Sequence, residues 1–281
     1  MVYIFTALYC EAQIFIRQFH LAKNLENRWF QEFQNESASM RLTITGVGEL
    51  AAAAAVSSIC SMYRPTPSDL LLNVGICAHT ARKEGIFICN QILELATGKT
   101  FYPDMLYRHP FCESAIVTGM MPWQAGKTPG TFGETLYDME AAAVYQAGIR
   151  FFAPHQMIFL KIVSDHGNAA DVSKEQVTLL MQNAQERIFD LIMQTAAITQ
   201  KHSSHNDELC EEDLQRFETF CADLHCSKAM RDSMRQYIRY LALSGMDYIG
   251  MIQELYDKKL LPCKDKKEGK QRFEEFKRKL F

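Results

Sequence analysis

Through residue 200 the chain alternates short apolar runs with longer stretches in which apolar positions recur at helical spacing. The run Leu70-Leu71-Leu72-Asn73-Val74-Gly75 is apolar at nearly every position, which is typical of a strand buried on both faces of a sheet. We expect strands at 2–8, 41–46, 70–75, 86–95, 113–119 and 156–164, and helices at 11–23, 49–63, 139–149 and 173–200. This alternation predicts an α/β domain with helices on both faces of the sheet.

The C-terminal part of the chain has a different pattern. After a polar stretch at 201–207, helical periodicity predicts helices at 207–226, 228–243, 246–259 and 266–280. The sequence therefore predicts two domains, an α/β domain at 1–204 and an all-helical extension at 205–281. Residues 258–281 hold ten Lys/Arg and four Asp/Glu. We interpret this run as a solvated helix face, with an anionic surface or partner as the alternative, and the extension is a candidate for binding a protein partner.

Composition narrows the classes of protein. Of 281 residues, 48% are hydrophobic and 22% charged, which supports a full core. A net charge of −3 gives no reason to expect a nucleic-acid partner. The first residues lack the basic lead of a signal peptide, and no apolar run predicts a membrane span. Nine cysteines without a CxxC pair indicate reduced thiols in the cytoplasm and no metal site.

Two acidic motifs stand at the ends of predicted elements. Tyr137-Asp138-Met139-Glu140 precedes an alanine-rich helix, and Ser164-Asp165 ends an apolar strand. An unpaired charge is costly at such a position. The two carboxylates therefore indicate a grip on one small polar molecule.

Two glycine motifs are weaker signals. Gly46-Val47-Gly48 joins a strand to a helix, where free backbone N–H groups can bind an anion or an oxygen-rich ligand. Ala51 occupies the place of the third glycine in GxGxxG, so no dinucleotide fingerprint is present. Gly75 ends the buried strand. Both motifs are equally well explained as tight turns.

The order of these motifs resembles the purine nucleoside phosphorylase and nucleosidase superfamily, and within it the methylthioadenosine/S-adenosylhomocysteine nucleosidases. The resemblance covers about residues 1–200 and rests on Thr45-Gly46-Val47-Gly48, Asn73-Val74-Gly75-Ile76-Cys77-Ala78, Val117-Thr118-Gly119, Asp138-Met139-Glu140-Ala141-Ala142-Ala143 and Val163-Ser164-Asp165. It implies a three-layer α/β/α fold, a homodimer and cleavage of the N-glycosidic bond of a purine nucleoside. It implies no metal or organic cofactor.

The resemblance also implies roles for single residues. Glu140 would hold the ribose hydroxyls, with Met139 packed against the sugar. Asp165, preceded by the site residue Ser164, would protonate the purine at N7. Such an acid needs a raised pKa, which burial at a strand end can supply.

The remaining implied residues complete a nucleoside site. Glu11 would orient or activate the attacking water, and Ala78 and Trp123 would line the base pocket. Carboxylates suit this chemistry, because departure of the base leaves a cationic sugar.

Each assignment has a structural alternative. Glu140 could be an ordinary acid at a helix N-terminus, Asp165 a cap of the turn before Gly167, and Glu11 a solvated acid in a first helical turn. Trp123 could serve only in packing. His166 is expected to be incidental or structural, with contact to the ligand as the alternative.

The chain departs from the family at several positions. Asn73 and Ile76 stand where phosphorylases carry the arginine and serine that bind phosphate, which favours water as the nucleophile. Nucleosidases usually carry Ser-Ala-Gly where this chain has Ile76-Cys77-Ala78. Asp138 is shorter than the usual acid, and Lys161 stands where arginine is frequent. The segment 96–112, expected to form the pocket rim, matches no family pattern.

The sequence thus predicts a nucleoside N-ribosyl hydrolase acting on an adenosine-like or 5′-modified purine nucleoside. A phosphorylase that binds phosphate through other residues is one alternative. A nucleoside-binding or scaffold protein without turnover is the other.

Overall fold

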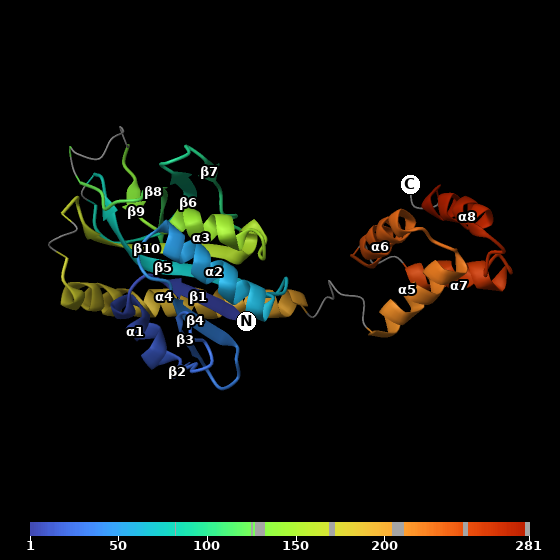
Figure 1. Ribbon diagram of the computed structural model, residues 1–281, viewed down its shortest axis with the longest axis horizontal. Helices are drawn as coiled ribbons and strands as arrows, with labels where there is room; N and C mark the ends of the chain where they lie inside the picture. The colour runs from blue at the N-terminus through green and yellow to red at the C-terminus, as the bar shows by residue number, and fades with distance from the viewer. Residues whose placement is uncertain are drawn as a thin grey trace. The chain divides into compact units, whose positions relative to one another are not determined.

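A mixed β-sheet organises the first of the two units into which the chain divides, Met1–Ser203 and Ser204–Phe281 (Figure 1). The computed structural model describes residues 1–81, 83–124, 126, 133–168, 172–203, 211–243 and 247–278. The predicted boundary at 204–205 lies outside these residues. In the first unit the strands are β1 (Val2–Thr6), β2 (Ala22–Lys23), β3 (Gln31–Gln34), β4 (Met40–Ile44), β5 (Leu70–His79), β6 (Ile86–Glu94), β7 (Thr100–Phe101), β8 (Cys112–Thr118), β9 (Leu136–Asp138) and β10 (Met157–Asp165). Its α-helices are α1 (Tyr9–Gln18), α2 (Glu49–Tyr63), α3 (Ala141–Gly148) and α4 (Lys174–Ser203), and a 3₁₀ turn, η1, spans Pro154–Gln156.

The centre of the sheet is parallel. Strand β1 lies between β4 and β5, and β5 also pairs in parallel with β10. Strand β10 then pairs with β6, β6 with β8, β8 with β9, and β9 returns to the end of β5. These pairings close a ring of five strands. The carboxyl ends of β1, β5 and β10 therefore lie at one edge of the sheet, where open α/β proteins bind their ligands.

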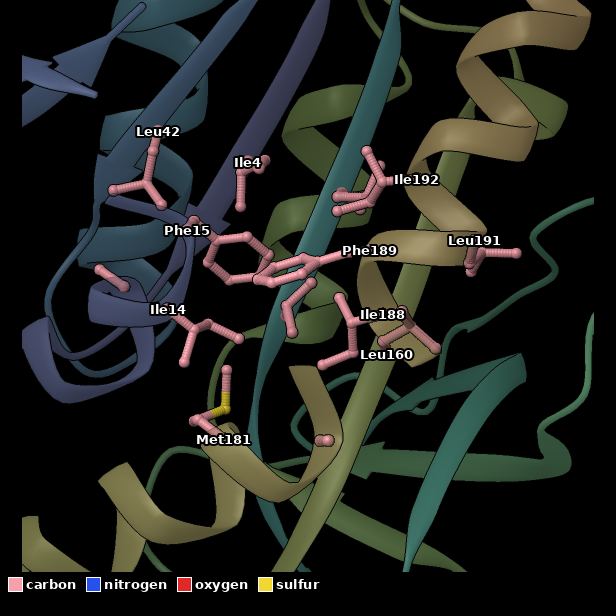
Figure 2. Close-up of a cluster of buried hydrophobic side chains, with 14 of the residues drawn as sticks. Ile4, Ile14, Phe15, Leu42, Leu160, Met181, Ile188, Phe189, Leu191 and Ile192 are labelled. Carbon is pink, nitrogen blue, oxygen red and sulfur yellow. The ribbon is translucent and has the colours of Figure 1, made fainter. Parts of the chain in front are cut away.

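Each central strand contributes side chains to two hydrophobic cores, one on each face of the sheet, because successive side chains point to opposite faces. Ile4 and Leu160 face helices α1 and α4, where they meet Phe15 and Phe189 (Figure 2). The rings of Phe15 and Phe189 pack edge to face, with centroids 5.8 Å apart. This core fixes α1, which carries Glu11, against the sheet.

The opposite face is covered by the two alanine-rich helices, α2 and α3 (Figure 1). Ala52 and Ala55 of α2 and Ala141 and Ala142 of α3 are completely buried. Such small side chains let the two helices approach the sheet and each other closely. The layers are therefore helix, sheet and helix, and the predicted three-layer α/β/α fold is confirmed.

The main differences from the predicted elements are short or polar strands. Strands β2, β3, β7 and β9 were not predicted, because two to four residues give no measurable alternation. Helix α1 ends at Gln18 rather than at 23, and β5 continues four residues beyond Gly75 to His79.

The second unit is helical, as predicted. Its helices are α5 (Glu211–Asp223), α6 (Lys228–Leu243), α7 (Tyr248–Asp257) and α8 (Lys266–Arg278). Their apolar faces enclose a core of their own that includes Phe217, Phe220, Ile238, Leu255 and Phe276. Among the described residues, none of the helices in either unit is long and apolar enough to span a membrane.

We expect Leu191→Ala to destabilise the first unit by about 2–5 kcal/mol, because Leu191 is 2% exposed within the core between α4 and the sheet. The matched control is Leu179→Ala on the same helix, where the side chain is 57% exposed and the change should stay within about 0.5 kcal/mol. Calorimetric unfolding of the full chain measures both. Equal effects of the two substitutions would contradict this packing.

Candidate functional site

A cavity of about 270 Å³ opens at the edge of the sheet where β1, β5 and β10 end. Its wall comes from the starts of α1, α3 and α4 and from the ends of β5, β9 and β10. All seven residues predicted for the site line it, namely Glu11, Ala78, Trp123, Met139, Glu140, Ser164 and Asp165. The fold therefore brings together motifs that are far apart in the sequence.

Glu11 lies in the first turn of α1 but is only 1% exposed, so it is not the solvated helix acid of the alternative interpretation. The backbone N–H groups of Ala7 and Leu8 donate to its Oε2 at 2.9 and 2.8 Å, and that of Ile76 donates to Oε1 at 2.9 Å. Burial raises the pKa of Glu11, although these N–H groups and Lys161 act in the opposite direction. The carboxylate is thus fixed between β1 and β5, and Oε1 keeps a lone pair for a ligand or water.

Gly75 makes room for this carboxylate. A Cβ atom at position 75 would lie 2.8 Å from Oε1 of Glu11, closer than real Cβ contacts allow. Close approach, rather than a turn, explains this glycine, because β5 continues through it to His79.

Glu140 occupies the position just before α3 and is 8% exposed. Its Oε1 accepts a 2.7 Å hydrogen bond from the backbone N–H of Gly48, the residue that caps α2 with φ = 100°. The glycine motif at 46–48 therefore binds an anion, but at Gly48 that anion is the chain's own Glu140 and not a ligand. Burial first, and then repulsion from Asp138, raise the pKa of Glu140 to about 7, against the attraction of Lys161 and the Gly48 N–H.

Beneath Glu140 lies a buried ion pair. Lys161 Nζ is 2.8 Å from Oδ2 of Asp138, with side chains 2% and 1% exposed. Asp138 also accepts hydrogen bonds from the hydroxyl of Thr118 and the N–H of Ala141. Burial disfavours the ammonium group, yet Asp138 and Glu140 outweigh it and hold the pKa of Lys161 above its ordinary value. The shorter acid and the lysine that depart from the family pattern are therefore each other's partners.

Asp165 ends β10 and is half-buried. The proposed proton donor is therefore less enclosed than expected from the sequence. Its Oδ1 accepts the N–H groups of Gly167 and Asn168, so it does cap the following turn. Its Oδ2 accepts the Ser164 hydroxyl at 3.0 Å. His166 contacts Glu84 and the carbonyl of His79, which agrees with its expected structural position.

The parts of the cavity wall around Trp123 and along α1 and α4 are largely apolar. Trp123 is half-buried and packs on Ala78 and Tyr137, so this residue both packs and lines the cavity. The side of the cavity formed by α1 and α4 carries Leu8, Cys10 and Val177. No residue of 96–112 lines the cavity, which corrects the prediction that this segment forms the rim. Instead, Phe111 belongs to the hydrophobic core between α4 and the sheet, and Met105 and Tyr107 pack against that core.

Sequence reasoning gave no site role to several residues that shape this cavity. Tyr137 is 3% exposed, and its hydroxyl lies where a Cβ of Gly119 would have to be. The two ends of the buried ion pair, Asp138 and Lys161, were noted only as departures. A lone lysine within the apolar strand 156–164 was the available signal, because a buried ammonium requires a buried acid.

The fold of the first unit is similar to that of solved 5′-methylthioadenosine/S-adenosylhomocysteine nucleosidases. A Helicobacter pylori nucleosidase mutant with 5′-methylthioadenosine in its active site superposes with a TM-score of 0.58 at 10% identity, covering 69% of this chain and 98% of that chain. A putative Borrelia burgdorferi nucleosidase bound to adenine superposes with a TM-score of 0.56 at 18% identity, covering 70% of this chain and 99% of that chain. The apo form of Arabidopsis thaliana 5′-methylthioadenosine nucleosidase superposes with a TM-score of 0.56 at 16% identity, covering 69% of this chain and 95% of that chain. No protein-family model and no curated protein sequence matches the chain.

We expect Lys161→Met to destabilise the first unit by about 3–5 kcal/mol, because it leaves the charge of Asp138 buried without a counter-charge. The double variant Asp138→Asn/Lys161→Met removes both charges and should recover most of that loss. Thermal unfolding by calorimetry measures both.

The control for this prediction is the exposed pair Lys83–Glu134, whose side chains are 55% and 65% exposed. Lys83→Met should change the free energy of unfolding by no more than about 1 kcal/mol. A double variant at 138 and 161 as unstable as Lys161→Met alone would show that the loss is one of packing and not of charge.

Proposed function

We propose that the first unit is a purine nucleoside N-ribosyl hydrolase acting on an adenosine-like or 5′-modified nucleoside. The observation that carries the proposal is the meeting of Glu11, Glu140 and Asp165 in one cavity, with Glu11 and Glu140 each fixed by backbone N–H groups. The fold shared with known nucleosidases supports the same reaction class.

In the proposed reaction the three carboxyl groups have separate tasks. Asp165 donates a proton to N7 of the purine, which makes the base a better leaving group. Glu140 accepts hydrogen bonds from the ribose hydroxyls and, with Glu11, stabilises the positive charge that develops on the sugar. Glu11 removes a proton from the attacking water, and burial, by raising its pKa, makes its carboxylate a stronger base.

The residues at positions 73 and 76 favour water over phosphate as the nucleophile. The side chain of Ile76 lines the cavity, and its N–H is already bonded to Glu11. The amide of Asn73 is buried and donates to the carbonyl of Phe5. Neither position offers a positive charge or a free donor for a phosphate dianion.

The resemblance further supports a cytoplasmic homodimer. The first unit exposes several large apolar side chains, among them Leu25, Trp29 and Leu50 at more than 80% exposure. These side chains are candidates for burial in a dimer interface. The helical unit is a second candidate for a protein contact, through its lysine-rich C-terminal helix.

The first test is release of free base from a panel of purine nucleosides, with and without inorganic phosphate. We expect release without phosphate, and a loss of roughly 10²–10⁴-fold in Asp165→Asn, because general acid catalysis contributes about that factor. His166→Asn is the neighbouring control and should retain most of the activity.

Three outcomes of this assay decide among the alternatives. Release only with phosphate would replace the hydrolase by a phosphorylase. Tight nucleoside binding without release would identify a binding protein, in which Asp165 only caps its turn. Full activity of Asp165→Asn would remove this residue from the chemistry.

The second prediction concerns pH. Glu140 accepts hydrogen bonds from hydroxyls best as a carboxylate, and its pKa is raised to about 7, so nucleoside affinity should rise with pH through that value. Between pH 6 and pH 8 we expect a gain of about tenfold, measured by calorimetric titration of the slow Asp165→Asn variant. In Asp165→Asn/Glu140→Gln the affinity should be lower and independent of pH over this range. The same pH dependence in both variants would assign it to another group.

A further inference from the structure

The C-terminal end of α5 is closed by a regular capping motif. His225 adopts a left-handed conformation with φ = 49°, and its N–H donates to the carbonyl of Ala222 at 2.9 Å. The N–H of Cys226 donates to the carbonyl of Cys221 at 3.0 Å. This pair of bonds is the Schellman motif, in which the residue after the left-handed position contacts the residue five places before it.

In this motif the two contacting side chains are usually apolar, but here both are cysteines. Cys221 is 1% exposed within the core of the helical unit, and Cys226 is half-buried against the same core. The hydrogen bond between their backbones holds the two residues close together, and their side chains are also hydrogen-bonded to each other. Both are free thiols in the structure.

The two thiols differ in character. Hydrogen bonding from Cys221 lowers the pKa of Cys226, and the charge of Arg231 acts in the same direction. The same interaction, together with burial, raises the pKa of Cys221. Cys226 is therefore the more accessible and more nucleophilic member, and Cys221 is placed to react second.

We propose that Cys221 and Cys226 form a reversible redox pair that a hydroperoxide oxidises to an intramolecular disulfide. The sulfur of Cys226 attacks the peroxide, giving a sulfenic acid and releasing an alcohol or water. The sulfur of Cys221 then attacks the sulfenic sulfur, forming the S–S bond and releasing water. Two thiols lose two electrons and two protons, and the peroxide O–O bond accepts them. A reducing dithiol reverses the reaction by exchange.

The other described cysteines lack this combination of access and a partner. Burial raises the pKa of the Cys10, Cys60, Cys77 and Cys89 thiols. Cys263 is buried in the helical unit and its pKa is also raised. Cys112 is exposed and lies in β8 of the other unit.

The position of the pair connects its state to the rest of the helical unit. Asp223, between the two cysteines, accepts the N–H of Cys263 at its carbonyl and the hydroxyl of Tyr256 at its carboxylate. His225 contacts the carbonyl of Cys263 through Nε2 at 3.0 Å. A disulfide would therefore brace the turn on which α7 and the connection to α8 rest. This inference is independent of the proposed nucleosidase activity.

The test uses the full chain, treated with hydrogen peroxide and then digested with trypsin. One tryptic peptide, residues 217–228, contains both cysteines. We expect it to lose two hydrogens on oxidation, to regain them with dithiothreitol, and to stay linked after a second cleavage at Leu224. Oxidation of Cys112 should be slower, and Cys112→Ser should leave the reaction unchanged.

Two variants identify the order of attack. Cys221→Ala should leave Cys226 as a sulfenic acid that dimedone traps, whereas Cys226→Ser should leave position 221 reduced. Because the wild-type peptide map needs no substitution, a folding defect in either variant leaves the main readout intact. If peptide 217–228 stays a dithiol while Cys112 is oxidised, or if its cysteines pair with other chains, the proposal is wrong.

Discussion

The first unit is organised around the burial of three carboxylates, Glu11, Asp138 and Glu140, at one edge of the sheet. An acid in such a place must find a counter-charge or backbone donors, because the cost of leaving it unpaired is several kcal/mol. One lysine, Lys161, supplies the only buried ammonium among the described residues. The rest of the compensation comes from N–H groups at the starts of helices and the ends of strands. That requirement explains why the starts of α1 and α2 lie beside Glu11 and Glu140.

This arrangement works against the stability of the unit. The pKa values of Glu11 and Glu140 are raised, so the folded state holds their protons more tightly than the unfolded chain does. Their contribution to stability therefore falls as pH rises from the ordinary carboxyl range toward about 7, where Glu140 ionises. A protein keeps such groups where their chemistry is used. In the neighbouring pair Asp138–Lys161 each charge offsets the desolvation cost of the other, and the pair holds the acidic site together.

Much of the fold could be predicted from the sequence because the central strands are apolar on both faces and the helices have regular spacing. Polar or very short strands such as β3 and β9 could not, since their existence depends on pairing with β4, β5 and β8. Of the seven predicted site residues, Met139, Glu140, Ser164 and Asp165 were recognised through motifs at element ends, and Glu11, Ala78 and Trp123 only through the family resemblance. The bonds that hold them were not, because the partners of Glu11 and Glu140 at Ile76 and Gly48 lie 65 and 92 residues away. Only the register of β1 with β5, and the packing of α2 against α3, reveals those pairs.

The same bonds bear on the choice of nucleophile. Backbone N–H groups at a strand end or a helix start are the usual means of binding phosphate. Here the N–H groups of Gly48 and Ile76 are both taken by the chain's own carboxylates. A phosphate dianion entering the cavity would have to displace Glu11 or lie beside it, and like charges at that separation repel strongly where water is excluded. A neutral water molecule meets no such barrier and gains a hydrogen-bond acceptor in Glu11. The side chains at Asn73 and Ile76 and the capture of N–H groups by acids thus both support the proposal of water as the nucleophile.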